Sequence, residues 1–392
     1  MMPVPTRLRA FAALWFCYFA AMGAYNPFLP LWMKELGFSA LAIGTVASLQ
    51  AWTRVLVPYA WGWLGDHTGQ RVLLIRCAAV GAALSAAGLL WAREYAWVAL
   101  ACTLLFVTNG GVVPLAEASL ARHVITAGGM DSARYGRVRV WGSLGFVGSV
   151  LGLGLVFDVI GIGWFPVLAA AGWGVLVIAA MRLPLVTEPP HGHDSAAGVL
   201  AVLRRPSVAW FFASMFFTVL AHTGVYTFFS LYLDSQGHGK STVGLLWALA
   251  AGCEVAWFWW QGRFFPRLQP HAWLQLAAAL SVLRFALTAA FGASLAMMAL
   301  AQALHAVTFG AQHAACIELI GRHFPGALRG RGQALYSVLG YGASGVIGGL
   351  AGGWLGSQFG FGSVFWASAG AAAVGWWCAA RSARAEARGV AA

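Results

Sequence analysis

Charged residues are scarce in this chain. Only 9% of its 392 residues are Asp, Glu, Lys or Arg, whereas 60% are apolar, and the mean hydropathy is +0.74. A soluble domain carries about 25% charged residues, so this composition excludes a soluble globular protein. The apolar runs are continuous and do not alternate with polar residues, which excludes a transmembrane β-barrel. We predict an all-α polytopic membrane protein.

The sequence also lacks the motifs of common enzyme classes. It contains no G-x-S-x-G, H-E-x-x-H or Walker A motif, and no dinucleotide-binding fingerprint. Its six cysteines lie inside apolar runs without a C-x-x-C pair, which is typical of small core residues and not of a disulfide framework or metal site. We therefore expect no enzymatic activity, no metal and no cofactor.

Twelve apolar runs are long enough to cross a bilayer, because a helix needs about 20 residues to span the hydrocarbon core. Arg7 and Arg9 precede the first run, but that run is longer than the core of a signal peptide, so we expect a retained helix. A polar segment separates six runs from six. It predicts an N-terminal bundle over 1–183, a cytoplasmic linker over 184–206, and over 207–392 a C-terminal bundle with a short basic tail. The predicted spans are 8–33, 39–64, 71–91, 96–121, 138–160, 163–182, 207–233, 241–263, 271–291, 295–321, 331–357 and 361–380.

The basic residues indicate how the chain is oriented. The formal net charge is +12, which in a soluble protein would suggest nucleic-acid binding. With the N-terminus in the cytoplasm, Lys34, Arg93 and Lys240 are the only basic residues of the loops that fall outside. Positive residues are enriched in cytoplasmic loops, so both termini are predicted to be cytoplasmic. The arginines then face the lipid bilayer, and we expect no nucleic-acid partner.

An internal repeat relates the two halves at an offset of 200 residues. No single match is specific, but together they keep their register through ten spans. Two parallel six-helix repeats are typical of a transporter whose site lies between the halves. The matches include Gly37 with Gly237, Gly44 with Gly244, Gly62 with Gly262, Thr108 with Thr308, and Arg122-His123 with Arg322-His323.

A glycine-rich segment follows the second run and carries one acid and one base. It reads Gly62-Trp-Leu-Gly65-Asp66-His-Thr-Gly69-Gln-Arg71, and we predict a tight charged loop. The pattern resembles the loop 2–3 signature of the major facilitator superfamily, and the resemblance extends over nearly the whole chain. It implies a fold of twelve transmembrane helices in two pseudo-symmetric six-helix bundles. The glycines would let two helix ends approach closely, and Asp66 could pair with Arg71 in a gating loop. The alternative is a solvated turn with a chance ion pair.

Several ionisable residues lie inside the predicted spans, where a charge costs at least about 2.5–3.5 kcal/mol and needs a reason. The repeat places Arg54 and Glu254 at equivalent depths, so we expect them to present opposite charges toward one cavity. An ion pair between Arg284 and Glu254 would reduce the cost of both. Each histidine could instead be a packing residue. The candidate substrate- or proton-binding residues are Arg54, Asn109, Glu117, Arg139, His222, Glu254, Arg284 and His305, with His313 and Glu318 as further intramembrane polar residues.

Two segments are similar to the lactose permease family. Gly136-Arg-Val-Arg139 resembles the start of its fifth span, which implies substrate binding by Arg139 and pairing with Glu117. Leu304-His305 resembles its tenth span, but Thr308 occupies the position of a proton-coupling glutamate. The proton would therefore need another carrier, for which we favour Glu254, followed by Glu117. Arg139 could instead be one more positive-inside residue with Glu117 as its structural partner.

Other segments resemble the branch that contains phenylpropionate permeases and the oligosaccharide and nucleoside proton symporters. They include Pro27-Phe-Leu-Pro30, Val243-Gly-Leu-Leu-Trp-Ala and Gly332-Gln-Ala-Leu-Tyr-Ser. The resemblance implies a monomeric symporter of the bacterial cytoplasmic (inner) membrane that uses the proton gradient to import a small organic solute, such as an aromatic carboxylic acid. The alternatives are an exporter of a sugar or drug-like solute, and a non-transporting assembly factor or sensor.

Overall fold

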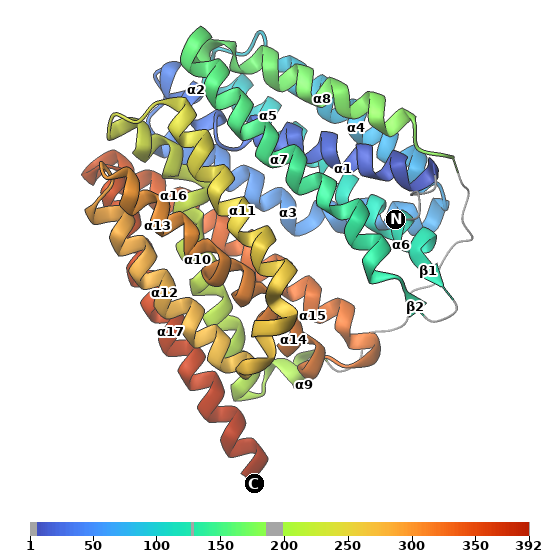
Figure 1. The fold of residues 1–392 in the computed structure, drawn as a ribbon, viewed down its shortest axis with the longest axis vertical. Coiled ribbons are helices and arrows are strands. Elements are labelled where there is room, and N and C mark those ends of the chain that lie inside the picture. Colours follow the sequence, from blue (N-terminus) through green and yellow to red (C-terminus); the bar gives the residue numbers. More distant parts are fainter. Residues whose placement is uncertain (1–5, 127–128, 186–198, 392) are drawn as a thin grey trace. The chain divides into compact units, whose positions relative to one another are not determined.

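The computed structural model describes residues 6–126, 129–185 and 199–391, and these residues are almost entirely helical (Figure 1). Among them, eleven helical segments are long and apolar enough to cross a membrane. Together with α17 they make up the predicted twelve. The chain is therefore a multi-pass membrane protein. The helices that form the first six segments are α1 (Thr6–Tyr25), α2 (Leu29–Glu35), α3 (Ala40–Thr68), α4 (Arg71–Gly88), α5 (Tyr95–Asn109), α6 (Val112–Val124), α7 (Ser132–Ile160), η1 (Ile162–Trp164) and α8 (Phe165–Met181).

The last six segments contain more interruptions. Two of them include π-helical stretches, in which the backbone hydrogen bonds are one residue wider than in an α-helix. Their elements are α10 (Pro206–Ser235), α11 (Lys240–Phe264), η2 (Phe265–Arg267), α12 (Pro270–Ala290), α13 (Leu295–Ala303), the π-helix η3 (Ala306–Ala311), α14 (Gln312–His323), η4 (Gly326–Leu328), α15 (Arg329–Leu335), the π-helix η5 (Tyr336–Ala343), α16 (Ser344–Phe359) and α17 (Phe361–Ala391).

Three details differ from the sequence prediction. A two-residue antiparallel pair, β1 (Ile125–Thr126) with β2 (Gly129–Met130), follows the fourth segment. The short helix α9 (Val199–Leu203) lies within the predicted linker, of which 186–198 are outside the described residues. The last helix continues well past the predicted end at 380, because the basic tail Arg381-Ser-Ala-Arg-Ala-Glu-Ala-Arg is rich in good helix formers.

The chain forms two compact units, and each unit includes the N-terminal part of one helix from the other half of the sequence. Unit 1 comprises 1–38, 53–193 and 239–248, and unit 2 comprises 39–52, 194–238 and 249–392. The boundaries thus fall inside α3 and inside α11. The N-terminal part of α3 belongs with the second half of the sequence, and the N-terminal part of α11 belongs with the first half.

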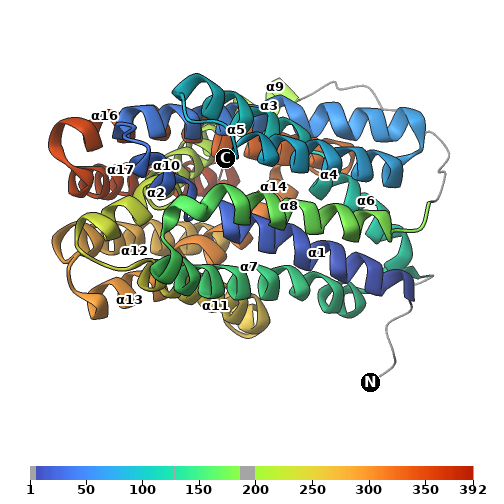
Figure 2. The same ribbon diagram turned by 90° about the horizontal axis from the view of Figure 1, so that it is seen from above.

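Each unit has its own apolar core. In unit 1, α1 packs against α7 and α8, while α4 packs against α5, α6 and α8 (Figure 2). Buried aromatic rings join these helices, such as Tyr25 with Phe106 and Phe165, whose ring centroids are each 5.9 Å away. In unit 2, α17 lies along α10 and α12 (Figure 1). Phe211, Met215 and other buried side chains of α10 pack there with residues of α12 and α14.

The predicted repeat is visible in two matching helix crossings, one in each unit. In unit 2, a Cβ on Gly44 of α3 would lie only 2.2 Å from the carbonyl oxygen of Gly349 in α16. In unit 1, a Cβ on Gly244 of α11 would lie 2.2 Å from the carbonyl oxygen of Val150 in α7. Only glycine permits backbones to approach this closely. The matched glycines therefore serve the same structural purpose in both halves.

Side chains from the facing helix cap the two crossing helices, and here the halves differ. The carboxylate of Asp158 in α7 accepts the backbone N–H groups of Lys240 (2.7 Å) and Ser241 (2.9 Å) at the start of α11. At the start of α3, the hydroxyl of Ser357 accepts the N–H of Leu41 (3.0 Å). An anionic cap also interacts favourably with the helix dipole, so the α11 crossing has the stronger cap.

Candidate functional site

A buried arginine organises the polar interior of unit 2. Arg284 in α12 is fully buried, and its guanidinium group donates to three neutral side chains. Nη1 donates to His305 Nδ1 (2.9 Å) and to Thr308 Oγ1 (3.0 Å), while Nη2 donates to Gln302 Oε1 (3.0 Å). All three partners come from the tenth segment, where α13 meets the π-helix η3. We call these four residues the Arg284 cluster.

His305 connects this cluster to a carboxylate on a third helix. Its Nε2 lies 3.2 Å from Oε2 of Glu254 in α11. An arginine can only donate, so His305 Nδ1 must accept the bond from Arg284, and the imidazole proton resides on Nε2. The geometry thus selects one neutral tautomer, which donates to Glu254. The ion pair expected between Arg284 and Glu254 is mediated by His305, which lies between them.

Three buried nitrogen atoms around the cluster have no hydrogen-bond partner among the described residues. They are Nε of Arg284, Nε2 of Gln302 and Nε2 of His222. His222 in α10 is bound through Nδ1 to the carbonyl oxygen of Thr218 (2.8 Å), and its ring centroid is 6.2 Å from that of His305. Nε of Arg284 and Nε2 of Gln302 are donors, whereas Nε2 of His222 is an acceptor in the neutral ring because Nδ1 donates to Thr218. An unpaired buried donor or acceptor costs roughly 1–3 kcal/mol, so this neighbourhood is suited to a group that can both accept and donate, such as a substrate hydroxyl or a water molecule.

An aromatic stack extends from His305 along the tenth segment. Phe309 lies nearly parallel to His305, with centroids 5.0 Å apart, and to His313, with centroids 6.1 Å apart. His313 Nδ1 is 2.8 Å from the hydroxyl of Tyr336, which lies 3.2 Å from that of Tyr341. The histidines and tyrosines thus lie within or beside η3 and η5, and π-helical segments are frequent at functional sites.

Unit 1 holds a second polar cluster, in which the arginine is partly exposed. Arg139 Nε in α7 lies 3.3 Å from Oε1 of Glu117 in α6, with about a third of each side chain exposed. The hydroxyl of Tyr135 donates to the other carboxylate oxygen of Glu117 (2.8 Å). The guanidinium carbon of Arg139 also lies 4.5 Å from the ring centroid of Trp15 and 4.6 Å from that of Phe19. We call this group the Arg139 cluster. The expected pair between Arg139 and Glu117 is present.

The remaining predicted residues of unit 1 have different partners. Asn109 is buried, accepts from the hydroxyl of Tyr18 (3.2 Å), and donates to the carbonyl oxygen of Leu105 (2.7 Å). Arg54 in α3 is exposed, and its guanidinium carbon lies 5.7 Å from the ring centroid of Phe106. Arg54 and Glu254 belong to different units, so the opposed charges expected of them remain a prediction.

The predicted gating segment is mostly helix and not loop. Helix α3 continues to Thr68, so Gly62, Gly65 and Asp66 are helical, and only Gly69 and Gln70 separate α3 from α4. Gly69 has a φ of +65°, a left-handed conformation that glycine adopts readily at the end of a helix. Asp66 Oδ1 and Arg71 Nη2 lie 2.5 Å apart, so the expected pair forms between the end of one helix and the start of the next. Its gating role remains a prediction.

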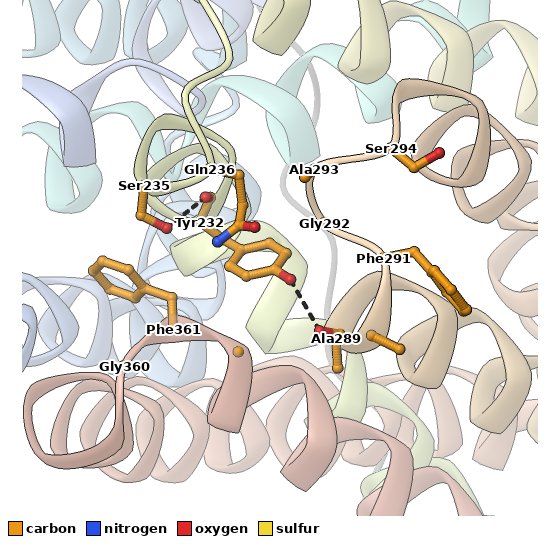
Figure 3. Close-up of a pocket in the computed structure, with 12 residues that line it drawn as sticks. Tyr232, Ser235, Gln236, Ala289, Phe291, Gly292, Ala293, Ser294, Gly360 and Phe361 are labelled. Carbon is orange, nitrogen blue, oxygen red and sulfur yellow. Dashed lines mark hydrogen bonds between the residues drawn. The ribbon is translucent and has the colours of Figure 1, made fainter.

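A pocket of about 610 Å³ lies at one end of unit 2, where α10, α12 and α16 end (Figure 3). The hydroxyl of Tyr232 donates to the carbonyl oxygens of Thr288 (2.9 Å) and Ala289 (3.0 Å), which ties α10 to α12. Gly292 passes beside this tyrosine, and a Cβ there would lie 2.2 Å from its hydroxyl oxygen. The pocket is lined by none of the charged cluster residues, so we do not take it as the candidate site.

Arg284, His305 and Glu254 are predicted from the sequence, but part of their surroundings is not. Gln302 is a polar residue in an apolar segment, three positions before His305, and this spacing could have revealed it as a neighbour. Thr308 is predicted as the repeat partner of Thr108 and as a departure from a family pattern, but not as a partner of Arg284, to which its hydroxyl is bound. Glu318 pairs with Arg322 one turn away in the same helix.

The fold and the two clusters define a class of protein. Twelve helical segments in two repeats, with buried charges inside apolar spans, are characteristic of secondary transporters. The chain belongs to the MFS_1 like family of the major facilitator superfamily, whose family model matches residues 8–367. It is therefore a transporter of this superfamily.

The relatives of the chain are transporters of different solutes. It is 28% identical to a maltose permease of Geobacillus stearothermophilus over 92% of this chain and 90% of that protein. It is 29% identical to the "Probable 3-phenylpropionic acid transporter" of Escherichia coli K12, over 91% and 92% of the two chains. Among solved structures, a single-site variant of the nucleoside transporter NupG superposes with a TM-score of 0.85 at 16% identity, over 96% of this chain and 100% of that one. This last likeness shows the fold alone.

Proposed function

We propose that this transporter is a proton-coupled symporter that imports a small organic carboxylate, such as an aromatic carboxylic acid, by alternating access. The observation that carries the proposal is the chain from Arg284 through His305 to Glu254. With Glu254 ionised, its negative charge balances that of Arg284, and a neutral imidazole connects the two. A proton on Glu254 removes this balance and leaves a buried, uncompensated cation. The protonation state of Glu254 therefore changes the electrostatic balance of the whole cluster.

The geometry supports Glu254 over Glu117 as the proton carrier. Glu117 has a donor at each carboxylate oxygen, Arg139 at Oε1 and Tyr135 at Oε2. Glu254 is paired with a histidine whose orientation depends on Arg284, and about a quarter of its side chain is exposed. It thus contacts the Arg284 cluster through His305 while part of its own side chain remains accessible. Proton carriers in membrane transporters combine these two properties.

Arg54 supports a carboxylate as the substrate group. It lies within a transmembrane span and forms no ion pair with any described carboxylate, in contrast to Arg139. An unpaired cation within a membrane span is costly, and an anionic substrate that binds it during the transport cycle would offset this cost. Phe106 beside it could contact an aromatic ring. The likeness to the phenylpropionic acid transporter favours this class of solute, whereas the likeness to the maltose permease favours a sugar.

Uptake by purified protein in proteoliposomes tests this function. We expect 3-phenylpropionate to accumulate under an inward proton gradient, and the gradient-dependent part to disappear with an uncoupler. Glu254→Gln should abolish accumulation but retain exchange across the membrane, because the neutral side chain mimics the protonated form. Glu318→Gln is the matched control and should accumulate solute normally. Uphill uptake by Glu254→Gln would refute Glu254 as the proton carrier.

The substrate class is tested in the same vesicles with maltose as the competing solute. Arg54→Gln should weaken transport of the carboxylate and leave that of a neutral analogue, the corresponding amide, unaffected. Efficient maltose uptake that does not require Arg54 would favour the sugar. Solute uptake that occurs only in inverted vesicles, whose outer surface is the cytoplasmic face, would favour an exporter.

We further propose that the protein works as a monomer in the bacterial inner membrane, with both termini cytoplasmic and no cofactor besides the proton gradient.

A further inference from the structure

A second pocket, with a volume of about 370 Å³, lies in unit 1 at the ends of the first and sixth segments. Arg7, Arg9, Ala10 and Ala13 contribute to it from the first turns of α1, and Arg182 and Pro184 from the residues after α8. Helices α1 and α8 pack against each other, and α8 ends where α1 begins. The proposed transport cycle gives no role to these residues.

The pocket combines three positive charges, and the described residues that line it include no acid. Arg7, Arg9 and Arg182 are exposed, and within the described part of the chain none of their side chains forms an ion pair or a hydrogen bond. Other arginines of the same unit do so, since Arg71, Arg134 and Arg139 each pair with a carboxylate. Three like charges around one pocket repel one another, and an anion placed between them would relieve this repulsion.

The walls of the pocket are held in position by neighbouring residues. Arg76 in α4 donates to the carbonyl oxygens of Met181 (2.9 Å) and Leu183 (2.7 Å), which flank Arg182 in the chain. Leu8, between Arg7 and Arg9, is 2% exposed, and Leu183 is 1% exposed. The backbone that carries each arginine is therefore anchored. The small side chains of Ala10 and Ala13 leave the space between the arginines open.

The position of the pocket limits the kind of anion. Arg7 begins the first membrane-spanning segment and Met181 ends the sixth, so the pocket lies at the level where the bilayer meets water. Lipid phosphate groups occupy this level, and guanidinium groups bind phosphate oxygens in a bidentate manner. We propose that Arg7, Arg9 and Arg182 form a binding site for an anionic phosphate group, supplied by an anionic lipid headgroup or by a soluble phosphate.

Binding can be measured on the purified full-length protein by native mass spectrometry, with phosphatidylglycerol, phosphatidylcholine and inorganic phosphate as separate probes. We expect selective binding of phosphatidylglycerol over the zwitterionic lipid. Arg182→Gln should weaken it about fivefold, as each basic residue near a membrane surface contributes about that factor. The triple variant Arg7→Gln, Arg9→Gln, Arg182→Gln should weaken it by about a hundredfold.

Two further variants separate a pocket from diffuse positive charge. Ala13→Leu fills the pocket without changing the charge, and it should weaken binding as strongly as Arg182→Gln. The variant Arg381→Gln, Arg384→Gln, Arg388→Gln removes three exposed arginines of α17 and should bind as the unmodified protein does.

The two probes identify the source of the phosphate. Binding of inorganic phosphate that is lost in the triple variant supports the site with a soluble ligand, whereas binding of phosphatidylglycerol alone supports it with a lipid. Equal binding of phosphatidylglycerol and phosphatidylcholine, or full binding by Ala13→Leu, would overturn the proposal. Because binding is measured without transport, a failure here is independent of the proposed symport.

Discussion

Arg284 and Arg139 both lie within transmembrane spans, yet the protein accommodates them in opposite ways. Arg284 is fully buried and is bound by three neutral side chains, with its carboxylate reached only through His305. Arg139 is about a third exposed, pairs directly with Glu117, and lies against the faces of Trp15 and Phe19. The stabilisation of Arg284 depends on geometry, because its neutral partners must be oriented toward the guanidinium group. The stabilisation of Arg139 depends mainly on charge and on contact area.

This difference indicates which cluster is sensitive to change. A buried charge that loses its partners is costly, whereas a partly exposed pair is replaced in part by water. Substitutions in the Arg284 cluster should therefore lower the free energy of unfolding strongly, whereas those in the Arg139 cluster should lower it little. A site that must rearrange when a proton binds benefits from the sensitivity of the Arg284 cluster to changes in its partners.

Replacement of each arginine by glutamine should give the largest contrast. Arg284→Gln leaves His305, Thr308 and Gln302 without their shared donor, and we expect it to lower the free energy of unfolding by about 3–5 kcal/mol. Arg139→Gln should cost about 1 kcal/mol, because Tyr135 still donates to Glu117 and water reaches the carboxylate. Thermal unfolding of both variants in the same detergent measures the two effects. Equal shifts in the unfolding midpoint would mean that burial does not distinguish the clusters.

A smaller change tests whether the neutral partners of Arg284 matter individually. Thr308→Val keeps the shape of the side chain but removes one of the two acceptors for Nη1 of Arg284, and it should cost about 1–2 kcal/mol. Thr103→Val in α5 is the matched control. Among the described residues its hydroxyl bonds only to the carbonyl oxygen of Ala99 in its own helix, at 2.7 Å, so we expect a change within about 0.5 kcal/mol. Comparable effects of the two substitutions would argue against a geometry-dependent cluster.

Much of the fold was predictable from the sequence, because a membrane span leaves a long apolar run and the repeat leaves matched glycines. Gly44 and Gly244 were paired by register alone, and both allow a close backbone crossing. The helical state of Gly65 and Asp66, beyond the predicted span 39–64, was not predicted. A single glycine costs only about 1 kcal/mol in a helix, which tertiary contacts can offset. At Gly65 a Cβ would lie 2.7 Å from Cδ2 of Leu115, so the glycine makes room for a neighbouring helix and does not break its own.

The site was predictable as a set of residues but not as a network. Arg284, His305 and Glu254 were recognised because charges within apolar runs are conspicuous. Their order of contact depends on how three helices are rotated about their axes, and successive residues point about 100° apart. The π-helix η3 changes this rotation between His305 and His313, and apolar periodicity does not reveal such a segment. The sequence therefore suggested a direct pair between Arg284 and Glu254, whereas His305 lies between them.

The smallest expected effect concerns salt, and it isolates the electrostatic part of the comparison. The Debye length falls from about 10 Å at 0.1 M to about 3 Å at 1 M ionic strength, which screens exposed pairs much more than buried ones. The stability difference between the unmodified protein and Arg139→Gln should thus shrink at high salt, by less than about 1 kcal/mol. The difference for Arg284→Gln should not change. Unfolding midpoints of the three proteins at low and high sodium chloride measure this. A salt-dependent difference for Arg284→Gln would show that ions reach the Arg284 cluster, and that its stability depends on charge as that of the Arg139 cluster does.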